Sequence, residues 1–424
     1  MQLLIRGIRI LDPQSGTDKQ GDILVQNGVI AEIGDALACT GAQVIDGTGL
    51  VAAPGLVDMH VHLRDPGFTE KEDLYSGCRA AAAGGVTSLL AMPNTRPTTD
   101  TPEVVADILA RAETADARVY VTAAITPGLK SEVLTDIAAV KQAGAIALSD
   151  DGRPVTDTRL MAQGMQQAAA LGLRVVSHCE DLFLAEGGVM NEGEISRQLG
   201  VPGIPAAAED CGTARDLALA ESYGVPIHIC HVSTATSAAM IRDAKKRGVP
   251  VTAETAPHYF SLTDTALLGK NPDCRMNPPL RTERDRLAII EALRDGTLDA
   301  IATDHAPHTP AEKAEFLKAP NGSIGMESSL AVGITFLVQP GHLTLSQLLS
   351  KMSAEPAKIL GIPAGQLQPG APADLVLFRE SERWVVDPDR LHGKSRNTPF
   401  AGMELSGKVK YTICRGKIVY QDEA

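Results

Sequence analysis

The middle of the chain alternates short apolar runs with longer amphipathic stretches. The apolar runs are bounded by turn-forming residues, as is typical of buried strands. They occupy residues 55–63, 85–94, 117–126, 145–152, 174–180, 226–233, 251–258 and 299–308. A helical pattern lies between them and is clearest over residues 103–115, 158–172, 237–248 and 284–296, with glycine ending the last three. Eight strands, each followed by a helical connection, predict an α/β fold of the (β/α)8 TIM-barrel type.

The two ends of the chain have a different pattern from the middle. Residues 1 to about 50 and those from about 367 onward form short strands in which apolar and polar positions alternate. Such strands need one another to bury a face. We therefore predict one small β domain assembled from both termini, residues 1–53 and 367–424, and a catalytic barrel over residues 54–366. An open doubly wound sheet is the alternative, but its phosphate-binding GxGxxG motif is missing from the first strand-helix turn.

Composition places this fold in an ordinary globular protein. The 424 residues are 44% hydrophobic and carry a formal net charge of -13, with acidic and basic residues interspersed. This pattern argues against nucleic-acid or membrane partners. The start of the chain lacks the pattern of a secretory signal, and no run reaches the roughly 18 apolar residues of a membrane span. Seven scattered cysteines without a CxxC pair suggest reduced thiols in a cytoplasmic protein.

Metal-ligating residue types recur where the predicted strands end. In a barrel these ends point to one face, where active sites are built. His60 and His62 are two residues apart and leave their strand on the same side. Four histidines and two carboxylates exceed the needs of one catalytic zinc and suit two ions about 3.5–4 Å apart that share a hydroxide and a bridging carboxylate. The predicted ligands are His60, His62, Asp151, His178, His231 and Asp304.

The imidazoles favour zinc, with manganese or cobalt as substitutes. Other histidines are interpreted as structural. His228 should point away from His231 if its strand is regular. The remaining structural histidines are His258, His305, His342 and His392, and His258 is the least certain because it also follows a predicted strand.

Further polar residues near these strand ends suggest a substrate site. Arg64 lies two residues beyond His62, and its planar fork suits bidentate capture of a carboxylate. Asn94, Asn277 and His308 are candidates for the rest of a polar cradle.

These motifs resemble the amidohydrolase superfamily and, within it, the type I class of dihydroorotases. DMHVHLRDPG, AMPNT, SDDG, SHCED, ICHVST, AETAPHYF, RMNPPLR and IATDHAPHT occur in the family order and span essentially the whole chain. The resemblance implies reversible cyclisation of N-carbamoyl-L-aspartate to (S)-dihydroorotate, a step of pyrimidine (UMP) biosynthesis. Related hydantoinases, allantoinases and type II dihydroorotases typically have a carboxylated lysine where this chain has Asp151. The nearest lysine, Lys141, lies back in a helical segment.

The resemblance also implies the roles of individual residues. His60, His62 and Asp304 would bind one zinc, His178 and His231 the other, with Asp151 and a hydroxide as bridges. Asp304 would act as base and then as acid, while Arg64, Asn94 and His308 would hold the substrate carboxylate. Asn277 and the backbone near Gly322 would contact the ring, and His62 lies close enough to count as a substrate contact as well.

Three points stay open at the sequence level. A hydantoinase-like or allantoinase-like cyclic amidase is the rival activity, although Asp151 and Arg64 argue against it. An inactive homologue that partners aspartate transcarbamoylase is the rival from another class, although all six metal ligands are present. By resemblance we expect a homodimer, with a transcarbamoylase complex as a further partner, and a mobile substrate loop over residues 309–325.

Overall fold

The computed structural model describes residues 2–422, and its centre is a parallel barrel. Neighbouring strands pair in the order in which they occur in the sequence. A parallel bridge between Val61 and His305, with a 2.9 Å hydrogen bond from His62 N to His305 O, joins the first strand to the end of the last. The strands are β6 (Leu56–Val61), β7 (Val86–Ala91), β8 (Arg118–Ala123), β9 (Ala147–Leu148), β10 (Arg174–Ser177), β13 (Ile227–Ile229), β14 (Val251–Thr255) and β15 (Ala300–Ile301).

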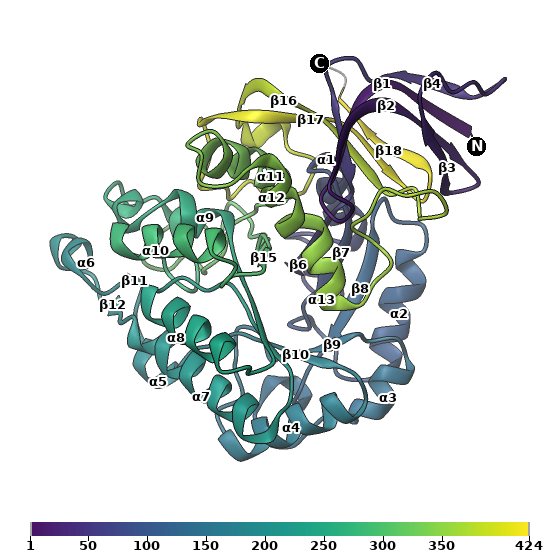
Figure 1. Ribbon diagram of the computed structural model, residues 1–424. Coiled ribbons are helices and arrows are strands. Elements are labelled where there is room, and N and C mark those ends of the chain that lie inside the picture. The colour runs from purple at the N-terminus through teal and green to yellow at the C-terminus, as the bar shows by residue number, and fades with distance from the viewer. Residues whose placement is uncertain (1, 423–424) are drawn as a thin grey trace.

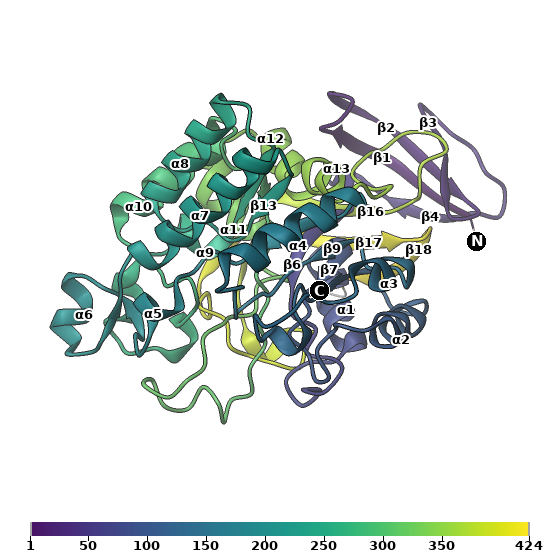
Figure 2. The ribbon, with the colours of Figure 1, turned by 90° about the horizontal axis from the view of Figure 1, so that it is seen from below.

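Helices surround the barrel (Figures 1 and 2). Side-chain caps fix several of their starts: Asp157, Thr234 and Thr282 each accept a hydrogen bond from a backbone N–H of the first turn. The main helices are α1 (Leu74–Ala83), α2 (Pro102–Ala112), α3 (Ile137–Gln142), α4 (Thr158–Ala170), α7 (Ala207–Tyr223), α8 (Ala235–Lys246), α10 (Glu283–Arg294), α11 (Ser329–Gly333), α12 (Leu345–Leu349) and α13 (Glu355–Leu360). Shorter insertions form α5 (Leu182–Ala185), β11 (Met190–Asn191), α6 (Glu194–Leu199), β12 (Gly203–Ile204) and α9 (Pro257–Ser261).

A separate sheet combines strands from both ends of the chain. In Figure 1 the purple N-terminal and yellow C-terminal strands lie together at the upper right. Its order is β18-β17-β16-β5-β1-β2-β3, with β4 beside β1. Ile5 and Ile23 share a buried core with Leu375 and Ile413, so neither terminus buries its apolar face alone. The strands are β1 (Gln2–Asp12), β2 (Thr17–Gln26), β3 (Val29–Gly34), β4 (Gln43–Asp46), β5 (Val51–Pro54), β16 (Leu375–Val385), β17 (Glu404–Cys414) and β18 (Lys417–Gln421).

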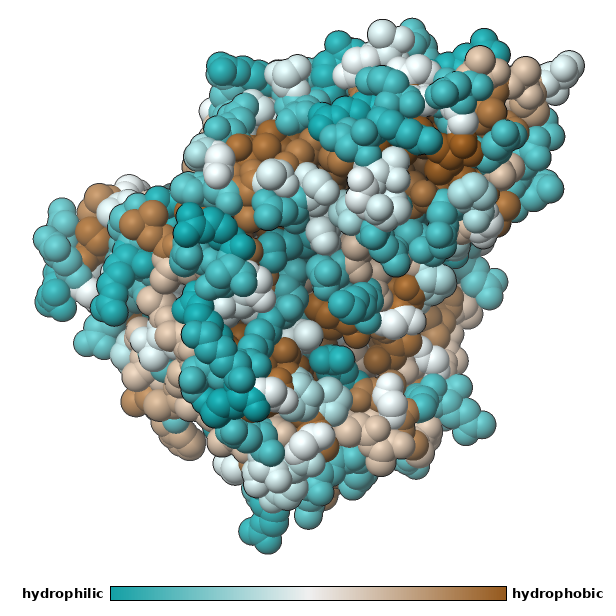
Figure 3. Space-filling model, in the orientation of Figure 1, coloured by the Kyte–Doolittle hydropathy of each residue, from teal (hydrophilic) through white to brown (hydrophobic). Residues whose placement is uncertain are grey.

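The predicted fold class is confirmed: each of the eight apolar runs contains a barrel strand, and the termini build a β domain. Apolar side chains such as Met59, Leu90 and Val176 fill the barrel interior. Hydrophilic residues cover most of the face shown in Figure 3, with hydrophobic residues visible over the small sheet. Within residues 2–422 no helix combines the length and apolar character needed to cross a membrane. The seven cysteines all lie in this range and are free thiols.

One part of the C-terminal region leaves the small sheet and returns to the barrel. Residues 393–397, here called the brace segment, lie between β16 and β17 in the sequence. The Oγ of Ser395 donates a 2.8 Å hydrogen bond to Lys71 O, and Lys394 N donates to both carboxylate oxygens of Glu72 at 3.2 and 3.3 Å. The sequence pattern assigned this segment to the β domain, because alternation of polar and apolar residues cannot show which loop folds back.

Candidate active site

The six predicted metal ligands come together at the carboxyl ends of the barrel strands. His60 lies near the end of β6 and His62 just beyond it, while the other four follow β9, β10, β13 and β15. Every one is buried, with at most 7% of its surface exposed. Residues more than 240 positions apart therefore share one small volume, as the barrel topology predicts.

Asp151 lies at the centre of this cluster. Its Oδ1 is 3.3 Å from Nε2 of His60, 3.6 Å from Nδ1 of His178 and 3.8 Å from Nε2 of His231. Its Oδ2 is 3.5 Å from Nε2 of His62. The carboxylate thus lies among all four predicted histidine ligands.

The two histidine pairs differ in their other neighbours. Oδ1 of Asp304 lies 3.2 Å from Nε2 of His62 and 3.6 Å from Nε2 of His60. On the other side, Nδ1 of His178 is 2.9 Å from Nε2 of His231. The donor atoms therefore form two overlapping groups, His60 with His62 and Asp151, and Asp151 with His178 and His231.

Unpartnered buried atoms show that these residues fit metal ions. Nε2 of His60 and Oδ1 of Asp151 are fully buried and make no hydrogen bond within residues 2–422. Leaving such atoms without partners is costly, and a cation held between them removes the cost. Imidazole nitrogens with carboxylate oxygens are a donor set that suits zinc.

The pKa values of the two carboxyl groups in the cluster also favour cation binding. Burial raises the pKa of the Asp151 carboxyl, but the nearby charge of His60 and the close approach of His231 outweigh burial, and the pKa lies well below its ordinary value. Burial likewise raises the pKa of Asp304, and contacts with His62 and His60 bring it below the usual range. Both carboxylates are therefore anionic and suited to binding a cation.

The sequence analysis missed the groups that orient these ligands. Nδ1 of His60 lies 3.2 Å from Oε1 of Glu254, and Nε2 of His178 lies 3.1 Å from Oε2 of Glu180. Such contacts fix the tautomer and ring orientation of a metal-binding histidine. Glu180 belongs to the quoted SHCED motif, and Glu254 is the one charged residue of its strand, Val251–Thr255; both signals were present in the sequence.

The histidines interpreted as structural do not belong to the two donor groups. His228 contacts Thr252 at 2.8 Å and Glu254 at 3.3 Å, on the far side of Glu254 from His60. His305 accepts a hydrogen bond from Gly325 N, and His392 pairs with Glu327. His258 is buried near the cluster, and burial lowers its pKa to about 4.

Arg64 is a half-buried cation beside the cluster. Its Nε donates a 3.2 Å hydrogen bond to Pro307 O, and its Nη2 lies 3.4 Å from Nε2 of His308. Within residues 2–422 its guanidinium forms no ion pair, and burial lowers its pKa. A guanidinium that is partly removed from water and has no carboxylate partner is well placed to bind an anionic ligand group.

The other predicted substrate residues surround the same opening. Asn94 Oδ1 is 2.8 Å from Nδ1 of His62, so this residue also orients a metal ligand. Asn277 Nδ2 donates a 3.0 Å hydrogen bond to Glu180, and within residues 2–422 its buried Oδ1 has no partner. Nε2 of His308 lies 2.9 Å from the carbonyl oxygen of Asn321. Burial and the Arg64 charge lower the pKa of His308 to about 3, so its ring is neutral.

The predicted substrate loop is docked in this structure. Nζ of Lys313 donates to Pro320 O at 2.8 Å and to Pro272 O at 3.1 Å, and Gly322 N donates to Arg275 O at 2.9 Å. The loop therefore packs on the segment before Asn277. Its mobility stays a prediction.

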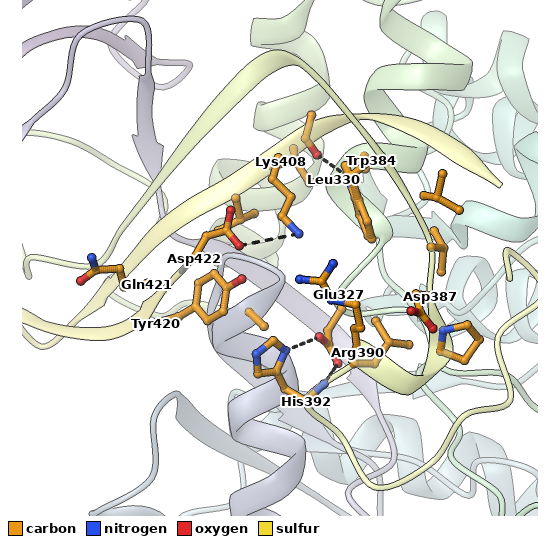
Figure 4. Close-up of a pocket in the computed structure, with 18 of the residues that line it drawn as sticks. Glu327, Leu330, Trp384, Asp387, Arg390, His392, Lys408, Tyr420, Gln421 and Asp422 are labelled. Carbon is orange, nitrogen blue, oxygen red and sulfur yellow. Dashed lines mark hydrogen bonds and ion pairs between the residues drawn. The ribbon is translucent and has the colours of Figure 1, made fainter. Parts of the chain in front are cut away.

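A large cavity of about 1210 Å³ lies elsewhere, between the small sheet and the start of α11. Figure 4 shows His392 beside Glu327, and Lys408 between Asp422 and Trp384. The His392 and Glu327 side chains are 2.8 Å apart, and Lys408 Nζ is 4.6 Å from the centre of the Trp384 ring. None of the predicted site residues belongs to the described lining, so this cavity is distinct from the candidate active site.

Solved structures with the same architecture identify the class. L-hydantoinase (dihydropyrimidinase) from Arthrobacter aurescens superposes with a TM-score of 0.88 at 25% identity, covering 99% of this chain and 96% of that chain. Dihydropyrimidinase from Brevibacillus agri gives a TM-score of 0.86 at 26% identity, covering 100% and 96%. The barrel and its histidine and aspartate cluster define a cyclic amide hydrolase of the amidohydrolase superfamily.

Sequence relatives define the family within this class. Residues 49–237 match a family model described as Dihydro-orotase-like. Proteins named dihydroorotase from Geobacter metallireducens and Syntrophus aciditrophicus are 51% and 50% identical, covering 99% and 100% of this chain and 100% of each relative. The one from Geobacter sulfurreducens is 52% identical over 99% of both chains. This chain belongs to the dihydroorotase family.

Proposed function

We propose that this chain is a type I dihydroorotase that catalyses the reversible cyclisation of N-carbamoyl-L-aspartate to (S)-dihydroorotate in pyrimidine biosynthesis. The observation that carries the proposal is the half-buried Arg64 guanidinium, which forms no ion pair within residues 2–422, beside the six-residue cluster. Dihydroorotate has a carboxylate for Arg64 and a ring amide carbonyl for the cluster. N-carbamoyl-L-aspartate has the same carboxylate, and a second carboxylate where the ring amide will form. Asp151 in place of a carboxylated lysine supports the type I class.

Two zinc ions fit the two donor groups. His60, His62 and Asp304 would hold one ion, His178 and His231 the other, and Asp151 both. When bound, zinc polarises an amide carbonyl and lowers the pKa of water. Arg64, Asn94 and His308 would orient the substrate carboxylate, and Asn277 with the Gly322 backbone would position the ring. Such positioning places the scissile amide next to Asp304.

Asp304 moves the proton in this proposal. Its carboxylate is ionised and lies among the ligand atoms, so it can accept a proton from the attacking water. The same group then delivers that proton to the ring nitrogen as the amide C–N bond breaks. In the direction of ring closure, the steps run in reverse.

Substrate preference tests the proposal. Steady-state rates with dihydroorotate and with hydantoin, measured on one zinc-loaded preparation, should favour dihydroorotate strongly. The rival is hydantoinase activity, because solved hydantoinases have the same architecture as this chain. A preference for hydantoin would establish that activity. No turnover of either substrate by protein with full zinc content would favour the inactive homologue.

Replacing Arg64 with lysine should raise KM for dihydroorotate about ten-fold to a hundred-fold, because a charge-assisted hydrogen bond contributes about 1.5–3 kcal/mol. The lysine keeps the charge but loses the planar fork. Arg118→Lys is the matched control, since Arg118 pairs with Asp374 at 2.7 Å at the start of β8, the opposite end of the barrel. An unchanged KM in Arg64→Lys would remove Arg64 from the carboxylate site.

Gly322→Ala should also weaken substrate binding. A Cβ at this position would lie 2.7 Å from Cβ of Ala306 and 3.1 Å from Nε2 of His308, and the backbone φ is +130°. We expect KM to rise by about ten-fold, since small displacements of binding groups are costly. Gly296→Ala is the control: it has a φ of +81° but nothing within 4 Å, so it tests backbone strain without the clash. Equal KM in both variants would contradict the proposed role of Gly322.

Assembly and location belong to the same proposal. We expect a cytoplasmic homodimer that acts on a small molecule, and a complex with aspartate transcarbamoylase as a further partnership. Sedimentation of the purified chain, alone and mixed with that enzyme, measures both: a monomer mass would exclude the dimer, and an unshifted boundary in the mixture would exclude the complex.

A further inference from the structure

Asn397, in the brace segment, contacts both ends of the predicted substrate loop with one side chain. Its Oδ1 accepts a 3.1 Å hydrogen bond from the backbone N–H of His308. Its Nδ2 donates to Ala306 O and to Gly322 O, both at 3.1 Å. Its own carbonyl oxygen accepts a 3.0 Å hydrogen bond from Ile324 N. The residue is 3% exposed, so water does not compete for these bonds.

These contacts fix two points between which the loop must run. His308 precedes the loop and Gly322 lies near its end, and the side-chain amide of Asn397 holds both. Residues 309–321 can therefore move only between these two fixed ends. Only a side chain with one acceptor and two donors can make all three bonds, and asparagine has the length that fits. Aspartate has the same shape but offers no donor to the two carbonyls.

The brace segment itself is firmly held. Ser395 and Lys394 bond to residues 71 and 72, which lie between β6 and α1. Because these contacts anchor the brace segment, Asn397 can hold His308 and Gly322 in place. The C-terminal region thus supplies a part of the active-site wall that the barrel segment 54–366 lacks.

We infer that Asn397 is a positioning residue that sets His308 and Gly322 for the substrate carboxylate and ring. The inference rests on the proposed function for the identity of the substrate. It assigns Asn397 no contact with substrate or metal. Its loss should act on substrate binding and on the loop, and should leave the metal cluster intact.

The test compares Asn397→Asp and Asn397→Ala with Ser395→Ala, which removes one bond of the same segment without touching the loop. We expect Asn397→Asp to raise KM for dihydroorotate about ten-fold or more, with kcat within a few-fold of wild type, and Asn397→Ala to raise it at least as much. Zinc content should match wild type. Ser395→Ala should raise KM much less than Asn397→Asp does, because Lys394 N still bonds to Glu72 and all Asn397 contacts remain. Equal KM changes in Asn397→Asp and Ser395→Ala, or a fall in kcat with KM unchanged, would overturn the inference.

A second measurement does not depend on the activity. Lys318 is an exposed trypsin site within the loop, with 77% of its side chain accessible. Cleavage after Lys318 should be faster in both Asn397 variants than in wild type and Ser395→Ala, because the bases of the loop are released. If wild type fails to hydrolyse dihydroorotate, the proposed function fails, while the cleavage rates still decide whether Asn397 holds the loop. Identical cleavage rates in all four proteins would show that it does not.

Discussion

Asp304→Asn should give a folded protein whose turnover of dihydroorotate falls by about 10²-fold to 10⁴-fold, the range expected for loss of a general acid-base group. Asp304 has a φ of +50°, a conformation that asparagine also tolerates, so the backbone is preserved. The amide keeps the shape of the carboxylate but cannot accept the proton of the attacking water.

Metal analysis separates the two effects of this change, since Asp304 is also a proposed ligand. A variant that retains two ions per chain and is still inactive supports the proton-transfer role. Asp299→Asn is the matched control, because Asp299 precedes the same strand at its other end and bonds to Lys245 at 2.6 Å. Normal turnover by Asp304→Asn would move the acid-base role to another residue, with His308 next in line.

Removal of metal should abolish activity, and zinc or cobalt should restore it. The expected loss is several kcal/mol of transition-state stabilisation, or about 10³-fold or more in rate. The unfolding temperature should fall with the metal, because an ion that binds only the folded chain stabilises it. Full activity in protein verified to be metal-free would refute the mechanism.

Single variants locate the ions. His60→Ala and His178→Ala should each lower the metal content, because each ring faces Asp151 from a different donor group. His392→Ala, which changes a half-exposed ring paired with Glu327, should keep the full content. Equal metal content in all three would contradict the assignment of the cluster.

The barrel, the β domain built from both termini and the gathering of the six predicted ligands at one face could all be predicted from the sequence. Short apolar runs followed by helical segments show the strand order, and in a parallel barrel that order brings the carboxyl ends of the strands together. His60, Asp151 and Asp304 therefore had to meet at one face. The place of Arg64 beside the cluster was predicted in the same way, because this residue closely follows the first barrel strand.

The neighbours of these residues became clear only from the folded structure. Asn94 contacts one predicted metal ligand, His62, and Glu254 and Glu180 contact two others, because side chains on different strands face one another across the barrel. Asn397 reaches His308 from 89 positions away, through a loop whose local sequence carries no periodic pattern. The periodicity of a strand shows which of its faces is buried. The contacts of Asn397 depend instead on how separate loops pack together, and no local pattern in a single sequence shows that packing.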